Sequence, residues 1–262
     1  MLRKNAISRV AACYSGRVPA ASQAERTSSV RHPGVVRVTH WLTFVAFIAL
    51  LITGGLIVIS HPRFYWGEVG NVNTKPLFVI PIPSSRSTIP NGYNYEMPDE
   101  NGWSRALHFE AAWVAVLTGL VYGIYGLWSG HFRKDLIPER RDWNWRAYWT
   151  RIAKYLQRGP PDSAEERSYN VLQRTAYVVV IFVLFPLIIW TGLAMSPSFT
   201  AAFPTTAAIL GGRQSARTIH FFVSWLLLLF LFVHVAMVAM SGFWSRVRGM
   251  ITANTRGREE GR

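Results

Sequence analysis

Four histidines of this 262-residue chain lie inside long apolar stretches, where a polar side chain is costly and is usually retained for function. They are His40, His108, His220 and His234. An imidazole in such a position can bind a metal, relay protons or only hydrogen-bond to a neighbouring helix. The other histidines, His32, His61 and His131, fall in predicted loops or at helix ends, where a solvated ring is the simpler interpretation. The four apolar histidines are therefore the candidates for chemistry.

The apolar runs around these histidines are each long enough to cross a bilayer, which takes about 20 residues. The runs are 38–59, 107–128, 175–195 and 218–240. They contain no lysine or arginine, and Glu110 is their only acidic residue. Each run is apolar on all faces, which favours burial in lipid over an amphipathic helix of a soluble protein. The sequence predicts an all-α integral membrane four-helix bundle, with a kink at Pro186 in the third helix.

Basic residues separate the two sides of this bundle. Of the 28 lysines and arginines, 22 lie in residues 1–37, 129–174 and 241–262, and six lie in 60–106 and 196–217. The positive-inside rule places the first group, and with it both termini, in the cytoplasm of a bacterial inner-membrane protein. The net charge of +14 then reflects membrane topology, and no nucleic-acid partner is predicted.

The segments outside the helices differ in character. We expect a disordered basic cytoplasmic tail at 1–31 and a basic cytoplasmic tail at 246–262, on either side of a membrane domain at 32–245. Residues 142–158 place aromatic and basic side chains at helical spacing, which predicts an amphipathic helix on the cytoplasmic leaflet. The outer loop, 60–106, holds six of the 14 prolines and is too long for a simple turn. It is either a small ordered cap or a docking surface.

Depth along the helices sorts the histidines into two levels. His108 and His220 lie near the outer ends of the second and fourth helices, whereas His40 lies near the inner end of the first. His234 follows His220 on the same helix face, about 21 Å or roughly 3.9 turns further along. His108 is therefore predicted to pair with His220 on the outer side. His40 is predicted to pair with His234 on the inner side.

Two histidine pairs at separate depths are what two b-type haems need, because a pair of imidazoles fills both axial positions of a haem iron. One tetrahedral zinc site would require all four histidines to lie together. A proton relay usually recruits carboxylates, and only Glu110 is available. The single cysteine, Cys13, excludes disulfides, covalent c-type haem, a thiolate zinc site and an iron–sulfur cluster. The pattern indicates electron transfer, and no catalytic residue is predicted.

An arginine precedes three of the candidate ligands by three residues. These arginines are Arg37, Arg105 and Arg217. Such a pair lies on one helix face, and each arginine lies one turn nearer the membrane surface, where haem propionates would emerge and favour a bidentate cation. Arginine also flanks membrane helices without binding a cofactor, so both interpretations stay open. His234 is not preceded by such an arginine.

Several segments resemble one known family, the bacterial cytochrome b-561 family. Its branch includes the cytochrome b subunits of membrane-bound formate dehydrogenase, NiFe-hydrogenase and thiosulfate reductase. The similar segments are 37–41 (RVTHW), the helix start at His108, 130–138 (GHFRKDLIP), 169–173 (YNVLQ) with Tyr177, 191–197 (TGLAMSP), and His220 with His234. The resemblance spans about residues 32–245, and the spacing of the histidines is its most specific part. The long outer loop and the basic N-terminal tail depart from the family pattern.

The resemblance implies two b-type haems in a four-helix core. It places His108 and His220 on the outer haem, and His40 and His234 on the inner one. It further implies electron transfer across the inner membrane between the quinone pool and a periplasmic oxidoreductase subunit, with a molybdopterin enzyme favoured. One alternative is a stand-alone quinone-linked redox enzyme such as a superoxide oxidase. A more remote alternative is a haem-free transporter or scaffold.

Overall fold

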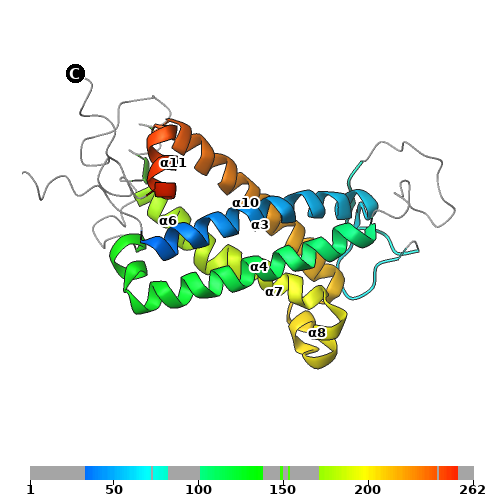
Figure 1. The fold of residues 1–262 in the computed structure, drawn as a ribbon. Helices are drawn as coiled ribbons and strands as arrows, with labels where there is room; N and C mark the ends of the chain where they lie inside the picture. The colour runs from blue at the N-terminus through cyan, green and yellow to red at the C-terminus, as the bar shows by residue number, and fades with distance from the viewer. Residues whose placement is uncertain are drawn as a thin grey trace, which may run out of the picture.

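The computed structural model of the protein describes residues 33–71, 73–81, 101–137, 148, 149, 153, 171–240 and 242–252. Within these residues the chain is mostly helical (Figure 1). The long helices are α3 (Gly34–Ser60), α4 (Asn101–Trp128), the continuous stretch α6 (Val171–Val179), η5 (Val180–Leu184) and α7 (Phe185–Met195), and α10 (Arg213–Met240). The shorter elements are β1 (Arg63–Phe64), β2 (Phe78–Val79), η3 (Phe132–Leu136), α8 (Pro197–Ala202), α9 (Thr205–Ile209) and α11 (Phe243–Thr252).

Four helical stretches are long and apolar enough to cross a membrane, as the sequence predicted. Large apolar side chains point outward from them: Leu127 is 74% exposed and Phe232 is 72% exposed. The buried positions instead hold small residues such as Thr53 and Ala216. Large apolar residues on the outside and small residues on the inside are typical of a helix bundle surrounded by lipid. The all-α membrane class is confirmed, with one two-residue strand pair as a small addition, and the chain is a multi-pass membrane protein.

Each long helix begins before its predicted start. The predicted starts were residues 38, 107, 175 and 218. α3 begins at Gly34 and α10 at Arg213, so that Arg37 and Arg217 belong to the helices. The helices extend further because a basic side chain in the first turn keeps its charge at the membrane surface while its stem stays apolar. The i,i+3 spacing of arginine and histidine is therefore helical in the structure.

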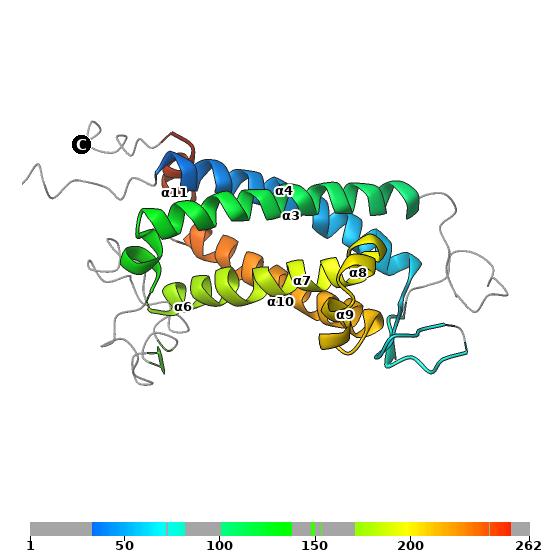
Figure 2. The same cartoon turned by 90° about the horizontal axis from the view of Figure 1, so that it is seen from below.

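The helices form two hairpins that face one another. α3 packs along α4, and α7 packs along α10. Figure 2 shows the two hairpins as two layers, with α3 and α4 in one layer and α6, α7 and α10 in the other. Any pair of side chains that meets between the layers therefore joins residues from different hairpins.

A seam of small buried residues joins α3 to α4. On α3 the buried residues recur every seven positions: Thr39, Ala46, Thr53 and Ser60. On α4 the buried residues Ser104, Ala111 and Thr118 recur at the same interval. A seven-residue repeat keeps one helix face against its neighbour, and small side chains let membrane helices approach closely. The seam fixes the register in which residues of α3 meet residues of α4.

Pro186 explains the irregularity of the third span. Proline has no backbone N–H, so the carbonyl one turn earlier loses its α-helical donor. The α-helix is interrupted by the π turn η5 directly before this proline, and α7 starts with Pro186 in its first turn. Such π turns commonly absorb a break in the hydrogen-bond ladder. The predicted kink site is thus the site of a π turn.

Part of the predicted outer loop is ordered as a cap, which we define as residues 61–71 and 73–81 and call the outer cap. Its strands β1 and β2 pair antiparallel, and Phe64 stacks on Phe78 with ring centres 4.7 Å apart. Phe64 also contacts Phe221 of α10 at 4.5 Å. The rest of the predicted loop, up to the start of α4, lies outside the described residues.

The outer cap is hydrogen-bonded to the first turns of α10. The carbonyl of Gly67 accepts the backbone N–H groups of Gln214 and Ser215 at 3.0 and 3.2 Å. The Ser215 hydroxyl accepts the Gly67 N–H at 2.8 Å, and the Thr218 hydroxyl donates to the Tyr65 carbonyl at 2.7 Å. These bonds satisfy N–H groups at a helix start that would otherwise lack partners. The cap is thereby fixed close to His220.

The remaining predictions concern segments outside the described residues and one predicted boundary that an observed helix crosses. The tail at 1–31 lies outside them, as does nearly all of the predicted amphipathic helix at 142–158. α11 was not predicted, and it crosses the expected boundary between the membrane domain and the tail at 246–262.

Candidate functional site

The outer histidine pair joins the two hairpins near the cap. His108 projects from α4 and His220 from α10, and their ring centres lie 6.4 Å apart with an interplanar angle of 60°. The two helices that carry them belong to different hairpins, since α4 packs on α3 and α10 packs on α7. The structure thus brings together the two outer histidines that the sequence paired.

A threonine hydroxyl contacts each outer histidine. The Thr53 hydroxyl of α3 lies 2.9 Å from Nδ1 of His108, and the Thr191 hydroxyl of α7 lies 2.9 Å from Nδ1 of His220. The two threonines are 1% and 0% exposed. Neither threonine was singled out from the sequence. Each histidine is therefore bonded to the other helix of its own hairpin, while its ring faces the opposite hairpin.

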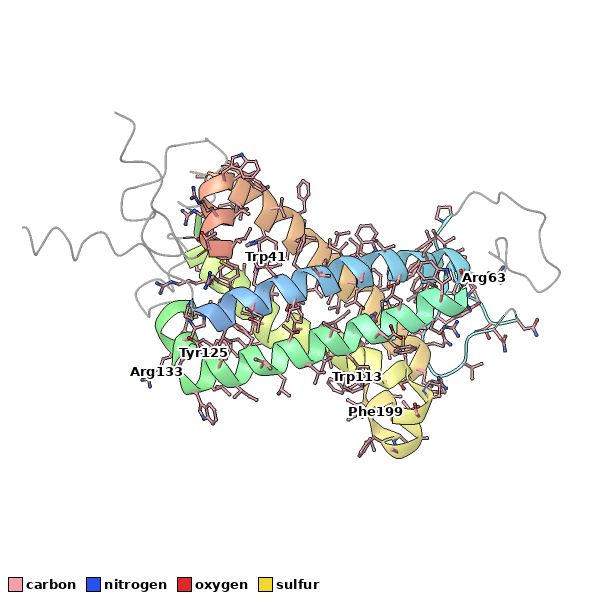
Figure 3. All side chains as sticks on the ribbon, viewed as in Figure 1. Trp41, Arg63, Trp113, Tyr125, Arg133 and Phe199 are labelled. Atoms are coloured by element: carbon pink, nitrogen blue, oxygen red, sulfur yellow. The ribbon has the colours of Figure 1, made fainter. Side chains whose placement is uncertain are left out.

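The inner histidine pair lies at the other end of the bundle. His40 of α3 and His234 of α10 have ring centres 6.3 Å apart with an interplanar angle of 53°. Phe230 stacks against His234 at 5.8 Å, and Tyr177 meets the same ring edge-on at 6.4 Å. In Figure 3, Trp41, which is next to His40 in the chain, lies well apart from Arg63 of the outer cap. The inner pair is surrounded by aromatic rings.

An apolar cluster fills the space between the two levels. Its buried members are Val180, Val223 and Leu227, and Phe47 and Phe230 pack against them. Val223 and Leu227 lie between His220 and His234 along α10. Packing of this kind excludes water and lowers the local dielectric constant. The two histidine pairs are therefore separate sites with a dry layer between them.

The ring separations suit two imidazoles on one iron. Metal–imidazole bonds are about 2 Å long, so imidazoles on opposite sides of one iron have ring centres about 6 Å apart. Both observed separations, 6.4 and 6.3 Å, meet this condition. Among the described residues, no group of three or more His, Cys, Asp or Glu could hold a metal ion. The residues fit a group that brings its own equatorial ligands, as haem does, and they do not fit a protein-built zinc site.

Arg217 holds the outer cap. Its guanidinium donates to the carbonyls of Arg63, at 3.2 Å, and His61. The same group lies over the ring of Phe64, 4.9 Å from its centre. These contacts give Arg217 a structural role that its spacing from His220 did not reveal. A propionate contact of Arg217 stays a prediction.

Arg37 and Arg105 differ from Arg217 in their surroundings. Arg37 donates through one terminal nitrogen to the carbonyl of Ile251 in α11 at 2.9 Å, and its buried Nε has no hydrogen-bond partner among the described residues. Arg105 is exposed at the start of α4. Both retain donors that a propionate could accept. Their assignment to propionates also stays a prediction.

The inner end is covered by α11, whose last turn is held by α3. Besides the bond from Arg37, the Trp41 indole N–H donates to the carbonyl of Met250 at 3.3 Å. Carbonyls in the last turn of a helix have no partner within that helix. α11 therefore ends against the same turn of α3 that carries His40.

Comparison with known proteins relates the chain to one family and to two named subunits. A family model for prokaryotic cytochrome b561 matches residues 31–253. A protein of Azospira oryzae, assigned by name as the protein-methionine-sulfoxide reductase subunit YedZ1, is 30% identical over 217 residues, covering 80% of this chain and 90% of the relative. A B-type cytochrome subunit assigned by name to a Ni/Fe-hydrogenase of Cupriavidus necator is 26% identical over 213 residues, covering 76% of this chain and 74% of the relative.

The fold and the paired histidines define a class, the membrane-embedded b-type cytochromes. Within that class, this chain belongs to the prokaryotic cytochrome b561 family. Membership confirms the resemblance noted in the sequence and implies b-type haem as the cofactor.

Proposed function

We propose that this protein is a di-haem cytochrome b subunit that carries electrons across the inner membrane between a periplasmic oxidoreductase and the quinone pool. The observation that supports it most strongly is the pair geometry. Two histidine pairs, at opposite ends of one bundle, have nearly equal ring separations of 6.4 and 6.3 Å. Two sites at different depths are what electron transfer across a membrane requires.

The chain holds the proposed haems mainly through its histidines. Haem with both axial positions filled supplies reversible one-electron chemistry and leaves no position for a substrate on the iron. His108 and His220 would bind the outer haem iron. His40 and His234 would bind the inner one. The apolar cluster around Leu227 keeps water out of the space between them.

The charge distribution supports one orientation in the membrane. The segments that hold 22 of the 28 basic residues all lie on one side of the four spans, which supports cytoplasmic termini. The start of α3 and helix α11 lie at the same end of the bundle (Figure 1). In this orientation the outer cap and the His108–His220 pair face the periplasm. The His40–His234 pair faces the cytoplasmic leaflet.

The names of the relatives support a partner subunit. One is named as a subunit of a protein-methionine-sulfoxide reductase and the other as a subunit of a Ni/Fe-hydrogenase. We propose that the partner of this chain is a periplasmic oxidoreductase of the molybdopterin type that docks near the outer cap. Its electrons would be exchanged at the outer haem, and those of the quinone at the inner one.

Reduction by quinol tests the proposal. Membranes that contain the chain are mixed with a short-chain quinol, and the b-type haem absorption is followed. We expect reduction in the native chain and in a His131→Ala control, because His131 belongs to neither pair, and loss of reduction in His40→Ala. Haem that dithionite reduces and quinol leaves oxidised in the native chain would contradict the quinone role.

Affinity purification separates a subunit from a stand-alone enzyme. The chain is purified from gentle detergent in its native host, and its companions are identified by mass spectrometry. We expect a periplasmic oxidoreductase in stoichiometric amount. A chain that purifies alone and oxidises superoxide with quinone as acceptor would support the alternative enzyme and overturn the partner.

A further inference from the structure

The two threonines beside the outer histidines make the same set of hydrogen bonds. The Thr53 hydroxyl lies 2.7 Å from the carbonyl of Ala49, and the Thr191 hydroxyl lies 2.8 Å from the carbonyl of Leu187. A hydroxyl has only one hydrogen to donate, and in each case a carbonyl of its own helix accepts it. The oxygen that faces the histidine is therefore an acceptor.

This arrangement favours one tautomer of each outer histidine. With the threonine oxygen as acceptor, Nδ1 of His108 and Nδ1 of His220 would carry the proton and donate it over 2.9 Å. The other ring nitrogen, Nε2, is then unprotonated and available as a metal ligand. A metal-binding histidine usually makes such a bond through its second nitrogen, which orients the ring and raises its basicity.

We propose that Thr53 and Thr191 are positioning residues of the outer haem site: they hold the ligand tautomer and ring orientation of His108 and His220, and they set the reduction potential of the outer haem. The inference deepens the proposed function and rests on it. The threonines act through the histidines and do not touch the iron themselves.

Repetition in the two hairpins supports a role beyond local packing. In each hairpin the first helix carries Thr-Gly, at Thr53-Gly54 and Thr191-Gly192, and the second carries Arg-x-x-His. A Cβ placed on Gly54 would lie 3.4 Å from Cε1 of His108, and one placed on Gly192 would lie 3.6 Å from Cε1 of His220. Both hairpins thus present a hydroxyl to Nδ1 and a bare backbone to Cε1. The same local site is built twice around one haem position.

Burial makes the two hydroxyls hard to replace. The side chains are 1% and 0% exposed. The backbone carbonyls of Leu50 and Ile188 also lie within hydrogen-bond reach of His108 and His220, so removal of a hydroxyl leaves each ring with one acceptor fewer. A buried donor that loses an acceptor is held less firmly. An imidazole that has lost this acceptor is also a weaker base, and it stabilises ferric haem, relative to ferrous haem, less than the native imidazole does. Removal of either hydroxyl is therefore expected to raise the outer potential and loosen the haem.

Valine and serine substitutions test the inference. Thr53→Val and Thr191→Val keep the side-chain shape and remove the hydroxyl, whereas Thr53→Ser and Thr191→Ser keep the hydroxyl. The purified chains are titrated anaerobically, and the outer haem is the titration step that disappears in His220→Ala. Electron paramagnetic resonance of the ferric state reports the ring orientation, and neither readout depends on activity.

In each valine variant we expect the affinity for oxidised haem to fall about tenfold more than the affinity for reduced haem. Such a change raises the reduction potential of the outer haem by about 59 mV for a one-electron couple. Haem affinity should fall about tenfold or more. The outer ferric signal should move, the inner one should not, and the serine variants should match the native chain. Loss of the outer haem in a valine variant and its retention in the serine variant would also support the inference.

Two results would overturn it. An unchanged outer potential and signal in the valine variants would remove the positioning role while leaving the two-haem function intact. Equal shifts in the valine and serine variants would assign the effect to packing rather than to the hydroxyl. A native chain that binds no haem would instead remove the proposed function itself, and the inference with it.

Discussion

The outer and inner histidine pairs have nearly the same separation and quite different neighbours. The ring centres lie 6.4 Å apart in the outer pair and 6.3 Å apart in the inner pair. At the outer end, hydroxyl groups bond to the histidines, whereas at the inner end Tyr177 and Phe230 pack against His234. Hydrogen bonds depend steeply on angle, and ring contacts allow more than one arrangement. The helices thus set the spacing of each pair, while the groups that contact His108, His220 and His234 differ between the two ends.

The segments that cover the two ends of the bundle, the outer cap and α11, are also bound differently. The outer cap is bound to α10 through backbone groups at Gly67 and Tyr65 and through Arg217. At the inner end, α11 is held to α3 through the side chains of Arg37 and Trp41. We therefore expect the outer end to be the more rigid half of the molecule. Among the contacts of the described residues given above, the inner end, where quinone exchange is proposed, is held by fewer groups.

Loss of a ligand should give the largest effect and test whether the pairs are independent. His108→Ala, His220→Ala and their double variant should each lose one haem, since one missing ligand disables the whole pair. His220→Ala combined with His234→Ala should lose both. Haem per chain is measured as the pyridine haemochrome. A double variant within one pair that lost two haems would show that the two sites are not separate.

Removal of Arg217 should weaken the outer end. Arg217→Ala deletes bonds from a charged group to the carbonyls of Arg63 and His61, at a cost of about 2–3 kcal/mol. We expect a lower unfolding temperature and faster proteolysis within the outer cap. Lys75→Ala is the matched control, because Lys75 is an exposed basic residue of the same cap. Equal losses in the two variants would rule out the specific role of Arg217.

A smaller effect is expected at the inner end from Tyr177. Tyr177→Leu keeps an apolar side chain and loses the aromatic contacts to Phe230 and His234, which are worth about 1 kcal/mol. Haem should leave the inner site severalfold faster, as followed by transfer to an acceptor protein. Tyr177→Phe, which keeps the ring, should hold the haem longer than Tyr177→Leu does. A change in the outer haem instead of the inner one would contradict the separation of the sites.

The smallest effect is expected from the contact between α3 and α11. Trp41→Phe keeps an aromatic ring and removes the donor to the Met250 carbonyl, at a cost of about 1 kcal/mol. Proteolysis after Phe243 should become faster, and the outer haem should keep its potential. Trp113→Phe is the control, because Trp113 lies on the exposed face of α4. Unchanged proteolysis would mean that the bond from Trp41 does not hold α11 in place.

The sequence predicted the features that depend on position along one helix. The four spans follow from apolar length, and the two levels of histidines follow from the rise per residue. The threonine partners were missed because they depend on the register between two helices. A readable signal was present: small residues every seven positions, at Thr39, Ala46 and Thr53, mark the face of α3 that meets α4.

Contacts between segments that are far apart in the chain were also not predicted from the sequence. The spacing of Arg217 from His220 predicted its helix face correctly but could not reveal that the cap, more than 150 residues earlier, would reach it. α11 was missed because its basic residues, such as Arg246 and Arg248, resembled those of a tail. Its exposed Phe243 and Trp244 were the clue to an interfacial helix.

Haem content combined with an anaerobic redox titration of the purified native chain tests the central claim most directly. Two haem sites at opposite ends of one bundle predict two b-type haems per chain, and two one-electron steps, because the two sets of neighbours differ. One haem per chain, or none, would contradict the account.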